Sequence, residues 1–289
     1  MPTTEIISGL AAVADRYDAV LCDVWGVIHN GETSFSAAYE ALARFQATRG
    51  PVVLISNAAR LNWAVLPQLH ALAVPENAYS ALVTSGDVTR LEIKARGAAA
   101  AWLIGPDRDH SLLNDLPVTI ANRPEDADYA ICTGLRDDET ETPDDYETEL
   151  KRLVGKPMIC ANPDRVVQRG DRLIYCGGAL ADVFQALGGE VVMAGKPYTP
   201  IYQSALTELN RLAGRAVALD RVLAIGDGLP TDLAGAQRMG LDCLFVTSGI
   251  HAADTQDAKG VVDLAKLERF LADRNAIARY AMAELGWGS

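Results

Sequence analysis

Short apolar segments alternate with helical patterns along this chain, and no other feature of the sequence constrains the fold as strongly. The helical patterns cover 36–48, 61–72, 199–213 and 231–239. The apolar segments are rich in Val, Ile and Leu and are typical of buried strands. They are 18–23, 51–56, 80–84, 100–104, 129–132, 157–160, 191–194, 221–226 and 242–247. Strands that alternate with helices predict an α/β fold with a parallel sheet and crossover helices.

The middle of the chain breaks this pattern and predicts an inserted module. Residues 106–150 contain the acidic run RDDETETPDDYETE, and residues 161–178 contain the loop signals NPD, QRGD and CGG. At 289 residues the chain is also longer than one core usually holds. We expect the core sheet to resume at Val191. The predicted domains are a core formed by 1–86 and 191–289 and an inserted domain at 87–190.

Two further stretches have the signals of a helix. The acidic run reads as a solvated helix start, with Thr142 as its N-cap ahead of Pro143. The C-terminal stretch 262–285 has apolar residues at helical spacing. We expect this stretch to pack on the core or on a second subunit.

Composition and charge exclude several kinds of protein. The net charge of −12 argues against a nucleic-acid binder, which needs a basic surface to displace counterions. No apolar tract approaches the length of about 18 residues that a membrane helix needs, and MPTTEIISGL lacks the features of a signal peptide. We therefore expect a soluble, cytoplasmic protein. The five cysteines are odd in number and widely spaced, so buried free thiols are expected rather than disulfides or a zinc site.

Four loops at strand ends or helix starts hold the residues that could carry chemistry. In chain order they are DVWGV with Asp23, the pair Ser56-Asn57 after PVVLI, the triplet Gly195-Lys196-Pro197 after EVVMA, and GDGLPTD with Asp227 and Asp232 after RVLAI. Parallel α/β sheets bind ligands at the carboxyl ends of their strands. Each residue alone could be an ordinary turn or surface residue, but their order and types together are specific.

These residue types are the ones that phosphoryl transfer through an aspartate needs. A carboxylate nucleophile is repelled by an anionic phosphate, so a divalent cation and positive donors must offset that repulsion. Asp23 can serve as nucleophile and as a Mg²⁺ ligand, and Asp227 as a second ligand. Lys196 and the Ser56 hydroxyl can bind the phosphate oxygens. Asp232 can orient a metal-bound water or Lys196.

The four loops resemble those of the haloacid dehalogenase-like superfamily. The insertion between the Ser56 and Lys196 loops resembles that of its class IIA hydrolases, which include nucleotide, sugar-phosphate, glycerol-phosphate and p-nitrophenyl phosphate phosphatases. Further similarity lies in NGETSFSAAYEAL, in Ala161-Asn162-Pro163-Asp164, in Gly177-Gly178-Ala179-Leu180 and in GDGLPTDLAGAQRMG. The resemblance covers roughly residues 15 to 250.

This resemblance implies a doubly wound, Rossmann-like core, an inserted α/β cap over the substrate and a requirement for Mg²⁺. The substrate would be a small phosphorylated metabolite, bound by Ser56, Asn57 and Lys196 with contacts from Trp25 and His29. The metal would be held by Asp23, the main-chain carbonyl of Trp25, Asp227 and Asp232. Relatives dimerise through the cap, and this chain could form a homodimer in the same way.

The chain departs from the family at Trp25, where phosphatases of the family have a second aspartate that protonates the leaving alcohol. An indole N–H donates hydrogen bonds but does not transfer its proton near pH 7. Loss of a general acid typically lowers the rate by about 10² to 10⁴. His29, on the same loop, is the nearest residue that could replace it.

Three interpretations of this departure are open. The first, which we favour, is a Mg²⁺-dependent phosphatase that is slow, limited to good leaving groups or dependent on another acid. The second is a dehalogenase-like hydrolase, because haloacid dehalogenases carry an aromatic residue at this position, although they lack the acidic loop of Asp227 and Asp232. The third is a protein that binds a phosphorylated ligand without catalysis.

Substrate choice would depend on the inserted domain, whose sequence shows no pocket that can be recognised. Four of its residues, Asn162, Asp164, Arg165 and Tyr175, could be either ligand contacts or ordinary loop residues.

Overall fold

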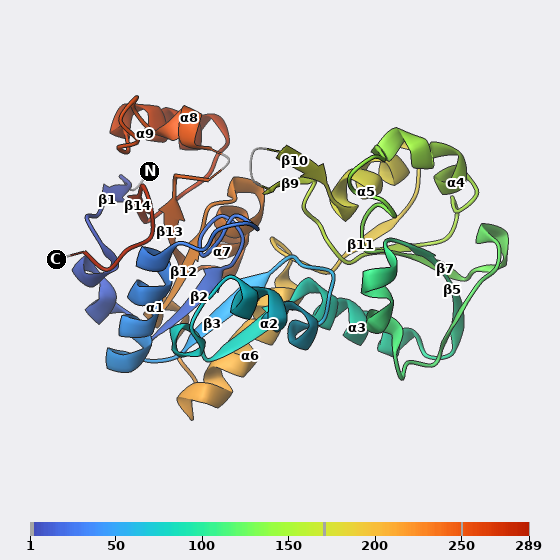
Figure 1. Cartoon of the computed structure of the whole chain (residues 1–289), viewed down its shortest axis with the longest axis horizontal. Coiled ribbons are helices and arrows are strands. Elements are labelled where there is room, and N and C mark those ends of the chain that lie inside the picture. The colour runs from blue at the N-terminus through green and yellow to red at the C-terminus, as the bar shows by residue number, and fades with distance from the viewer. Residues whose placement is uncertain (1–2, 170–171, 250, 289) are drawn as a thin grey trace. The chain divides into compact units, whose positions relative to one another are not determined.

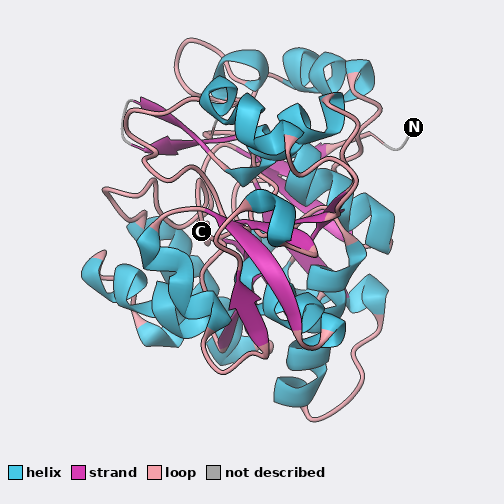
Figure 2. Cartoon of the chain, turned by 90° about the vertical axis from the view of Figure 1, so that its right-hand side faces the viewer, coloured by secondary structure: helices cyan, strands magenta, loops and turns pink. Residues whose placement is uncertain are grey.

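The computed structural model describes residues 3–169, 172–249 and 251–288 and divides the chain into two compact units (Figure 1). The first unit consists of Met1–Ser56, Pro67–Val83 and Tyr202–Ser289, and the second of Asn57–Leu66 and Thr84–Ile201. Each unit is built on its own sheet. Helices surround the strands (Figure 2).

The first unit contains a seven-stranded sheet in the order β1-β14-β13-β12-β2-β3-β4. The pairs from β1 through to β3 are all parallel. The strands are β1 Glu5–Ile6, β2 Ala19–Asp23, β3 Val52–Ser56, β4 Ala81–Thr84, β12 Val222–Gly226, β13 Asp242–Val246 and β14 Tyr280–Met282. The helices of this unit are α1 Ser36–Thr48, α7 Ala234–Met239, α8 Ala252–Thr255 and α9 Leu264–Asp273. Helices α2 Asn62–Ala71 and α6 Thr199–Ala213 begin in the second unit and end in the first.

The strand order reverses direction between β2 and β12, which makes the sheet doubly wound. From β2 the chain moves to β3 and β4 on one side, whereas β12 and β13 extend the sheet on the other side. Because crossover connections are right-handed, the two directions place their helices on opposite faces. The reversal leaves a crevice at the carboxyl ends of β2 and β12.

The central strands of this sheet can be recognised in the sequence because they are buried. All five residues of β2, of β3 and of β12 are buried, as expected for strands covered on both faces. Helix α1 buries Ala38, Ala41, Leu42 and Phe45, which follow helical spacing and form one face. The predicted strands and the predicted helix over 36–48 are confirmed.

The second unit contains a five-stranded parallel sheet in the order β11-β8-β7-β5-β6 and a separate hairpin of β9 and β10. The strands are β5 Ala99–Ile104, β6 Val118–Ile120, β7 Tyr129–Cys132, β8 Met158–Cys160, β9 Val166–Arg169, β10 Arg172–Tyr175 and β11 Val191–Met193. The helices are α3 Ser85–Arg96, α4 Glu147–Lys151 and α5 Gly177–Ala186. The inserted module is therefore an α/β unit with a hydrophobic core of its own.

The prediction that the core sheet resumes at Val191 is wrong. Strand β11 pairs with β8 in the second sheet, and the core sheet resumes with β12. A three-residue apolar run has the same pattern in either sheet, so its pairing partner could not be read from the residues. The limits 87–190 for the inserted domain stay a prediction.

The prediction of a helix throughout 262–285 is also wrong in its second half. Helix α9 ends at Asp273, and Asn275 then has a positive φ of 53°, which a helix cannot contain. Strand β14 follows, is fully buried and pairs with β13 and β1. Its apolar residues continue the spacing of one helical face, so the sequence pattern does not distinguish this short strand from a longer helix.

Two other local predictions are confirmed. The Thr142 side chain accepts the main-chain N–H of Asp145 and the Asp145 side chain accepts that of Thr142, which forms a capping box. Pro143 opens a 3₁₀ turn that leads into α4. All five cysteines are free and buried.

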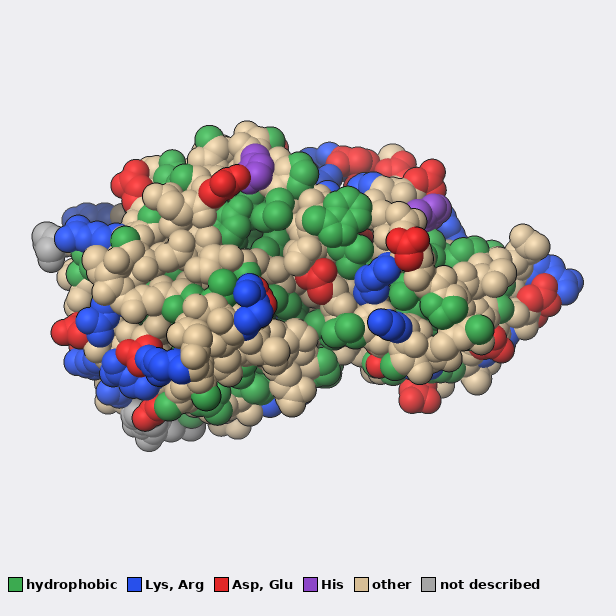
Figure 3. Space-filling view, turned by 90° about the horizontal axis from the view of Figure 1, so that it is seen from below, with side chains coloured by type: hydrophobic (Ala, Val, Ile, Leu, Met, Phe, Trp, Pro, Cys, Tyr) green, Lys and Arg blue, Asp and Glu red, His purple; other side chains and the backbone are tan. Residues whose placement is uncertain are grey.

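The surface carries charges of both signs. On the face in Figure 3, Lys and Arg side chains lie among Asp and Glu side chains. None of the helices in the described part of the chain combines the length and the hydrophobicity that a membrane span requires. Many charges form exposed ion pairs, such as Arg123 with Asp126 and Arg152 with Glu125, which contribute little to stability individually.

The core of the second unit yields a test of its packing. Phe184 is fully buried in a cluster with Leu150, Met158 and Leu180. We expect Phe184→Ala to lower the free energy of unfolding by about 3–5 kcal/mol, because it removes apolar contacts and leaves a cavity. Urea denaturation would measure the change. Leu173→Ala is the control: this side chain is 65% exposed, so its loss should cost less than about 0.5 kcal/mol. Equal losses in the free energy of unfolding for Phe184→Ala and Leu173→Ala would contradict the packing of Phe184 in this core.

Candidate active site

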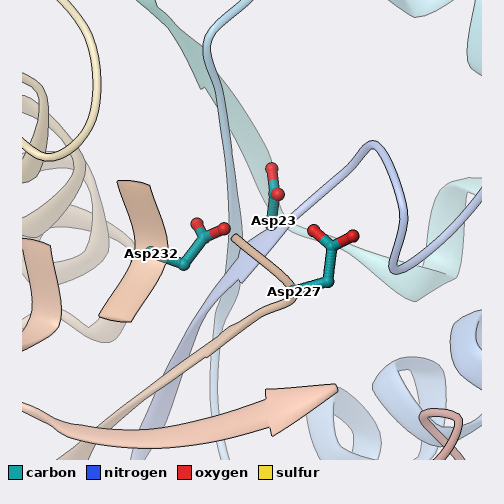
Figure 4. A group of neighbouring side chains, drawn as sticks. All are labelled: Asp23, Asp227 and Asp232. Carbon is teal, nitrogen blue, oxygen red and sulfur yellow. The ribbon is translucent and has the colours of Figure 1, made fainter. Parts of the chain in front are cut away.

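Three buried carboxylates converge at the reversal of the core sheet (Figure 4). Asp23 is the last residue of β2, and Asp227 follows β12, the strand that pairs with β2. Asp232 comes from the turn that follows Asp227. Each side chain offers an oxygen within 4.8 Å of the others, and the three residues are 7%, 8% and 3% exposed. The structure thus brings together the three aspartates that the sequence singled out.

A wide helical turn orients Asp232. Leu229–Leu233 forms a π-helical turn in which the N–H groups of Asp232 and Leu233 both donate to the Gly228 carbonyl. The Asp232 carboxylate accepts the Gly228 N–H at 3.0 Å, which directs it back toward the strand end. Such turns interrupt regular helices and are frequent at functional sites. The predicted helix at 231–239 therefore begins in this turn and becomes α-helical only in α7.

Two glycines leave room for the Asp227 carboxylate. A Cβ at Gly26 would lie 2.1 Å from Asp227 Oδ2, and a Cβ at Gly249 would lie 1.9 Å from the same atom. Gly26 also has a φ of +85°, which few other residues adopt. Gly249 was not found from the sequence, because only the folded chain brings the loop after β13 against Asp227.

The donor set fits a hard divalent cation. Buried carboxylates this close together repel one another when ionised, and burial adds a cost for each charge. A cation bound to their oxygens would remove both costs, and oxygen ligands are those that Mg²⁺ and Ca²⁺ prefer. The Asp23 carboxylate is partly held by the chain, since its Oδ1 accepts the N–H of Val24 at 2.7 Å.

Ser56 lies beside these carboxylates at the same edge of the core sheet. Strand β3 pairs with β2 in parallel, and Asp23 is opposite Ile55, the residue before Ser56. Ser56 is 8% exposed. Its predicted role as a phosphate donor stays a prediction.

Trp25 and His29 form a small aromatic pair on the loop after β2. Their rings meet edge to face with centroids 5.0 Å apart. His29 is 2% exposed, its Nδ1 accepts the Gly31 N–H at 3.0 Å, and burial lowers its pKa to about 4. A histidine with this pKa is neutral at pH 7. His29 therefore lacks the imidazolium proton that a replacement for the missing acid would donate.

Asn57 and Lys196 belong to the second unit, and both are buried at 4% and 2% exposure. The Lys196 N–H donates to Asn57 Oδ1 at 2.7 Å, and Asn57 Nδ2 donates to the Lys196 carbonyl at 3.3 Å. Lys196 is thus not a surface lysine, the ordinary alternative for this residue. The roles of both residues toward a substrate stay predictions.

Four residues of the inserted domain could be either ligand contacts or ordinary loop residues, and their surroundings differ. They are Asn162, Asp164, Arg165 and Tyr175. Asp164 Oδ1 accepts Asn57 Nδ2 at 2.8 Å, and Asn162 Oδ1 accepts the Asp164 N–H at 3.1 Å. Arg165 forms an ion pair with Asp182, and Tyr175 is 43% exposed. Asp164 therefore contacts a predicted site residue, Asn57, within the same unit.

Comparison with known proteins identifies the family of the chain. Residues 20–119 match the family model of haloacid dehalogenase-like hydrolases, and residues 193–266 match an HAD-hydrolase-like model. The chain is 44% identical to a haloacid dehalogenase-like hydrolase from Brucella suis 1330, whose crystal structure matches with a TM-score of 0.86 over 97% of this chain and 100% of that one.

Two enzymes of known activity are more distant relatives. Ribonucleotide monophosphatase NagD of Escherichia coli K12 is 23% identical over 252 residues, which are 83% of this chain and 91% of NagD. D-glycerol 3-phosphate phosphatase of Mycobacterium tuberculosis H37Rv is 22% identical over 246 residues, which are 84% of this chain and 67% of that enzyme. Together with the full-length match to the Brucella protein, these similarities identify the family. The chain belongs to the haloacid dehalogenase-like family and is a hydrolase.

Proposed function

We propose that this hydrolase is a Mg²⁺-dependent phosphomonoesterase that acts on a small phosphorylated metabolite through an aspartyl phosphate at Asp23. The observation that carries the proposal is the group of three buried carboxylates, Asp23, Asp227 and Asp232, within 4.8 Å of one another at the reversal of the sheet. The names of the two phosphatase relatives, which act on a ribonucleotide monophosphate and on D-glycerol 3-phosphate, support the substrate class.

The proposed reaction has two steps at phosphorus. An Asp23 carboxylate oxygen forms a bond to phosphorus while the bond to the leaving oxygen breaks, and water then hydrolyses the aspartyl phosphate. The Ser56 hydroxyl and the Lys196 ammonium bind the phosphate oxygens. Bound Mg²⁺, held by Asp23, Asp227, the Trp25 carbonyl and Asp232, would offset the negative charge of nucleophile and phosphate.

The leaving oxygen must take up a proton unless it is already a weak base. Trp25 occupies the position of the usual acid, and the neighbouring His29 is neutral at pH 7 because burial lowers its pKa to about 4. We therefore propose that the enzyme is slow with alkyl phosphates and faster with substrates whose leaving groups have a low pKa.

A phosphatase assay of the purified full-length chain tests this function. We expect hydrolysis of p-nitrophenyl phosphate that requires Mg²⁺ and stops when a chelator is added. Activity that chelation does not change would contradict the proposed metal site. Halide release from a 2-haloacid without metal, in a protein that does not cleave the phosphate ester, would instead support dehalogenase chemistry at the Trp25 loop.

The close approach of Gly249 to Asp227 predicts a loss of metal affinity in one variant. In Gly249→Ala the new Cβ would displace the Asp227 carboxylate, which now lies 1.9 Å from that position. We expect the Mg²⁺ concentration for half-maximal activity to rise at least about 10-fold. The control is Gly286→Ala, whose Cβ would have Ala37 Cβ at 3.9 Å as its nearest neighbour, and which should leave this concentration unchanged. An unchanged value in Gly249→Ala would argue against Asp227 as a ligand.

A further inference from the structure

The side-chain amide of Asn57 binds both main-chain polar groups of Lys196. Asn57 Oδ1 accepts the Lys196 N–H at 2.7 Å, and Asn57 Nδ2 donates to the Lys196 carbonyl at 3.3 Å. These two residues are 139 positions apart in the chain, and both are almost fully buried. A paired contact of this kind restrains the position and the tilt of the Lys196 peptide groups, from which the side chain extends.

Asp164 determines which way the Asn57 amide faces. Its Oδ1 accepts the second Nδ2–H of Asn57 at 2.8 Å. A carboxylate can only accept hydrogen bonds, so it selects the orientation with Nδ2 toward Asp164 and leaves Oδ1 for the Lys196 N–H. A bond from an amide to a charged carboxylate is also stronger than one between neutral groups.

Asp164 is itself held at the start of helix α5. Its N–H donates to Asn162 Oδ1 at 3.1 Å, and its carbonyl accepts the Gly178 N–H at 3.0 Å. A Cβ at Gly178 would lie 2.6 Å from that carbonyl oxygen, so only glycine allows the helix to approach this closely. The acceptor that orients Asn57 is therefore fixed by its own main chain.

The main chain before Lys196 packs against the same amide. A Cβ at Gly195 would lie 2.3 Å from Asn57 Oδ1, 2.8 Å from Pro163 Cδ and 2.9 Å from Ser85 Oγ. Only glycine leaves space there for Asn57. Loops that follow β3, β8 and β11 thus meet around one amide, all within the second unit.

We infer that Asn57 is a positioning residue for Lys196, and that Asp164 supports it by orienting its amide. This inference rests on the proposed function, which assigns the Lys196 ammonium to the phosphate. Both N–H groups of the Asn57 amide are engaged within the protein, so Asn57 acts through Lys196 rather than by donating to the substrate. A displacement of about 1 Å in such a group can lower a rate about 10²-fold.

A double-mutant cycle with Lys196 tests whether Asn57 acts through it. We expect Asn57→Ala to lower kcat/KM about 30–100-fold, by the same factor for p-nitrophenyl phosphate and for an alkyl phosphate, because Lys196 binds the phosphoryl group common to both. In the Lys196→Ala background the same change should cost less than about 3-fold. Losses that multiply, or that differ between the substrates, would overturn the inference and indicate an independent contact.

A second test exchanges the side chains of Asn57 and Asp164, so that neither residue is shortened to alanine. Asn57→Asp places one carboxylate against another and should lower kcat/KM about 10²-fold, whereas Asp164→Asn keeps an oxygen acceptor and should have a smaller effect. The double variant Asn57→Asp, Asp164→Asn restores the bond with donor and acceptor exchanged. We expect it to be at least about 10-fold more active than Asn57→Asp alone. A double variant no more active than Asn57→Asp would overturn the role of Asp164.

Asn210→Ala provides the matched control for loss of an amide contact. Asn210 Oδ1 accepts the Val217 N–H at 2.8 Å on helix α6, so this variant also loses a bond from a side chain to the main chain. We expect its Tm to fall while kcat/KM stays within about 2-fold.

Asp23→Asn distinguishes failure of the proposed function from failure of the inference about Asn57. If Asp23→Asn stays active, the proposed function fails. If Asp23→Asn is inactive and Asn57→Ala keeps full activity, only the inference fails.

Discussion

Asp23→Asn should lose Mg²⁺-dependent phosphatase activity by at least about 10⁴-fold, the largest effect we expect from any single substitution in this chain. The amide keeps the size of the carboxylate, so the loop should fold as before. It is not a nucleophile toward phosphorus, and it lacks the negative charge that would help to hold the cation. Initial rates with p-nitrophenyl phosphate at saturating Mg²⁺ would measure the loss.

The other end of the same strand offers a matched control. Asp18 precedes β2, and hydrogen bonds from Arg221 and Arg215 lower the pKa of its carboxyl to about 2. Asp18→Asn also replaces a carboxylate by an amide, but just before strand β2, at the opposite end of the strand from the proposed site. We expect it to change stability while leaving the rate within about 2-fold. A fully active Asp23→Asn would show that another group forms the bond to phosphorus.

The core of the fold could be predicted because parallel strands buried on both faces have little freedom in composition. The runs at 18–23, 51–56 and 221–226 became β2, β3 and β12 with their residues buried. A polar residue stands at or directly after the end of each run, and so lies at the carboxyl edge of the sheet. Asp23, Ser56 and Asp227 could be placed together for this reason, before any contact was known.

Pairing and packing across long separations could not be predicted in the same way. Strand β11 has the composition of a core strand but pairs in the second sheet, and the apolar residues of β14 continue the spacing of the helix before it. The hydrogen bond between Asn57 and Asp164 joins residues 107 positions apart, and Gly249 meets Asp227 only after β13 is in place. No local pattern carries such contacts, since each depends on the register and order of several strands.

Trp25→Asp should raise the turnover of alkyl phosphates about 10²-fold and that of p-nitrophenyl phosphate by much less. The new carboxyl group would supply the proton that an alkoxide needs on leaving, whereas p-nitrophenolate leaves without one. The main-chain carbonyl at this position stays available, because only the side chain changes. The comparison of kcat for one alkyl and one aryl substrate, in wild type and variant, measures the difference.

Trp25→Asn separates proton transfer from the loss of the indole. The Trp25 ring contacts His29 edge to face, and a Cβ at Gly31 would lie 2.6 Å from Trp25 Cη2, so either replacement opens the same space in the loop after β2. Both variants should lose about 1–3 kcal/mol of stability, but the amide cannot act as an acid. If Asn raised alkyl turnover as much as Asp, or if Asp raised aryl and alkyl turnover equally, access to the site rather than the missing proton would limit this enzyme.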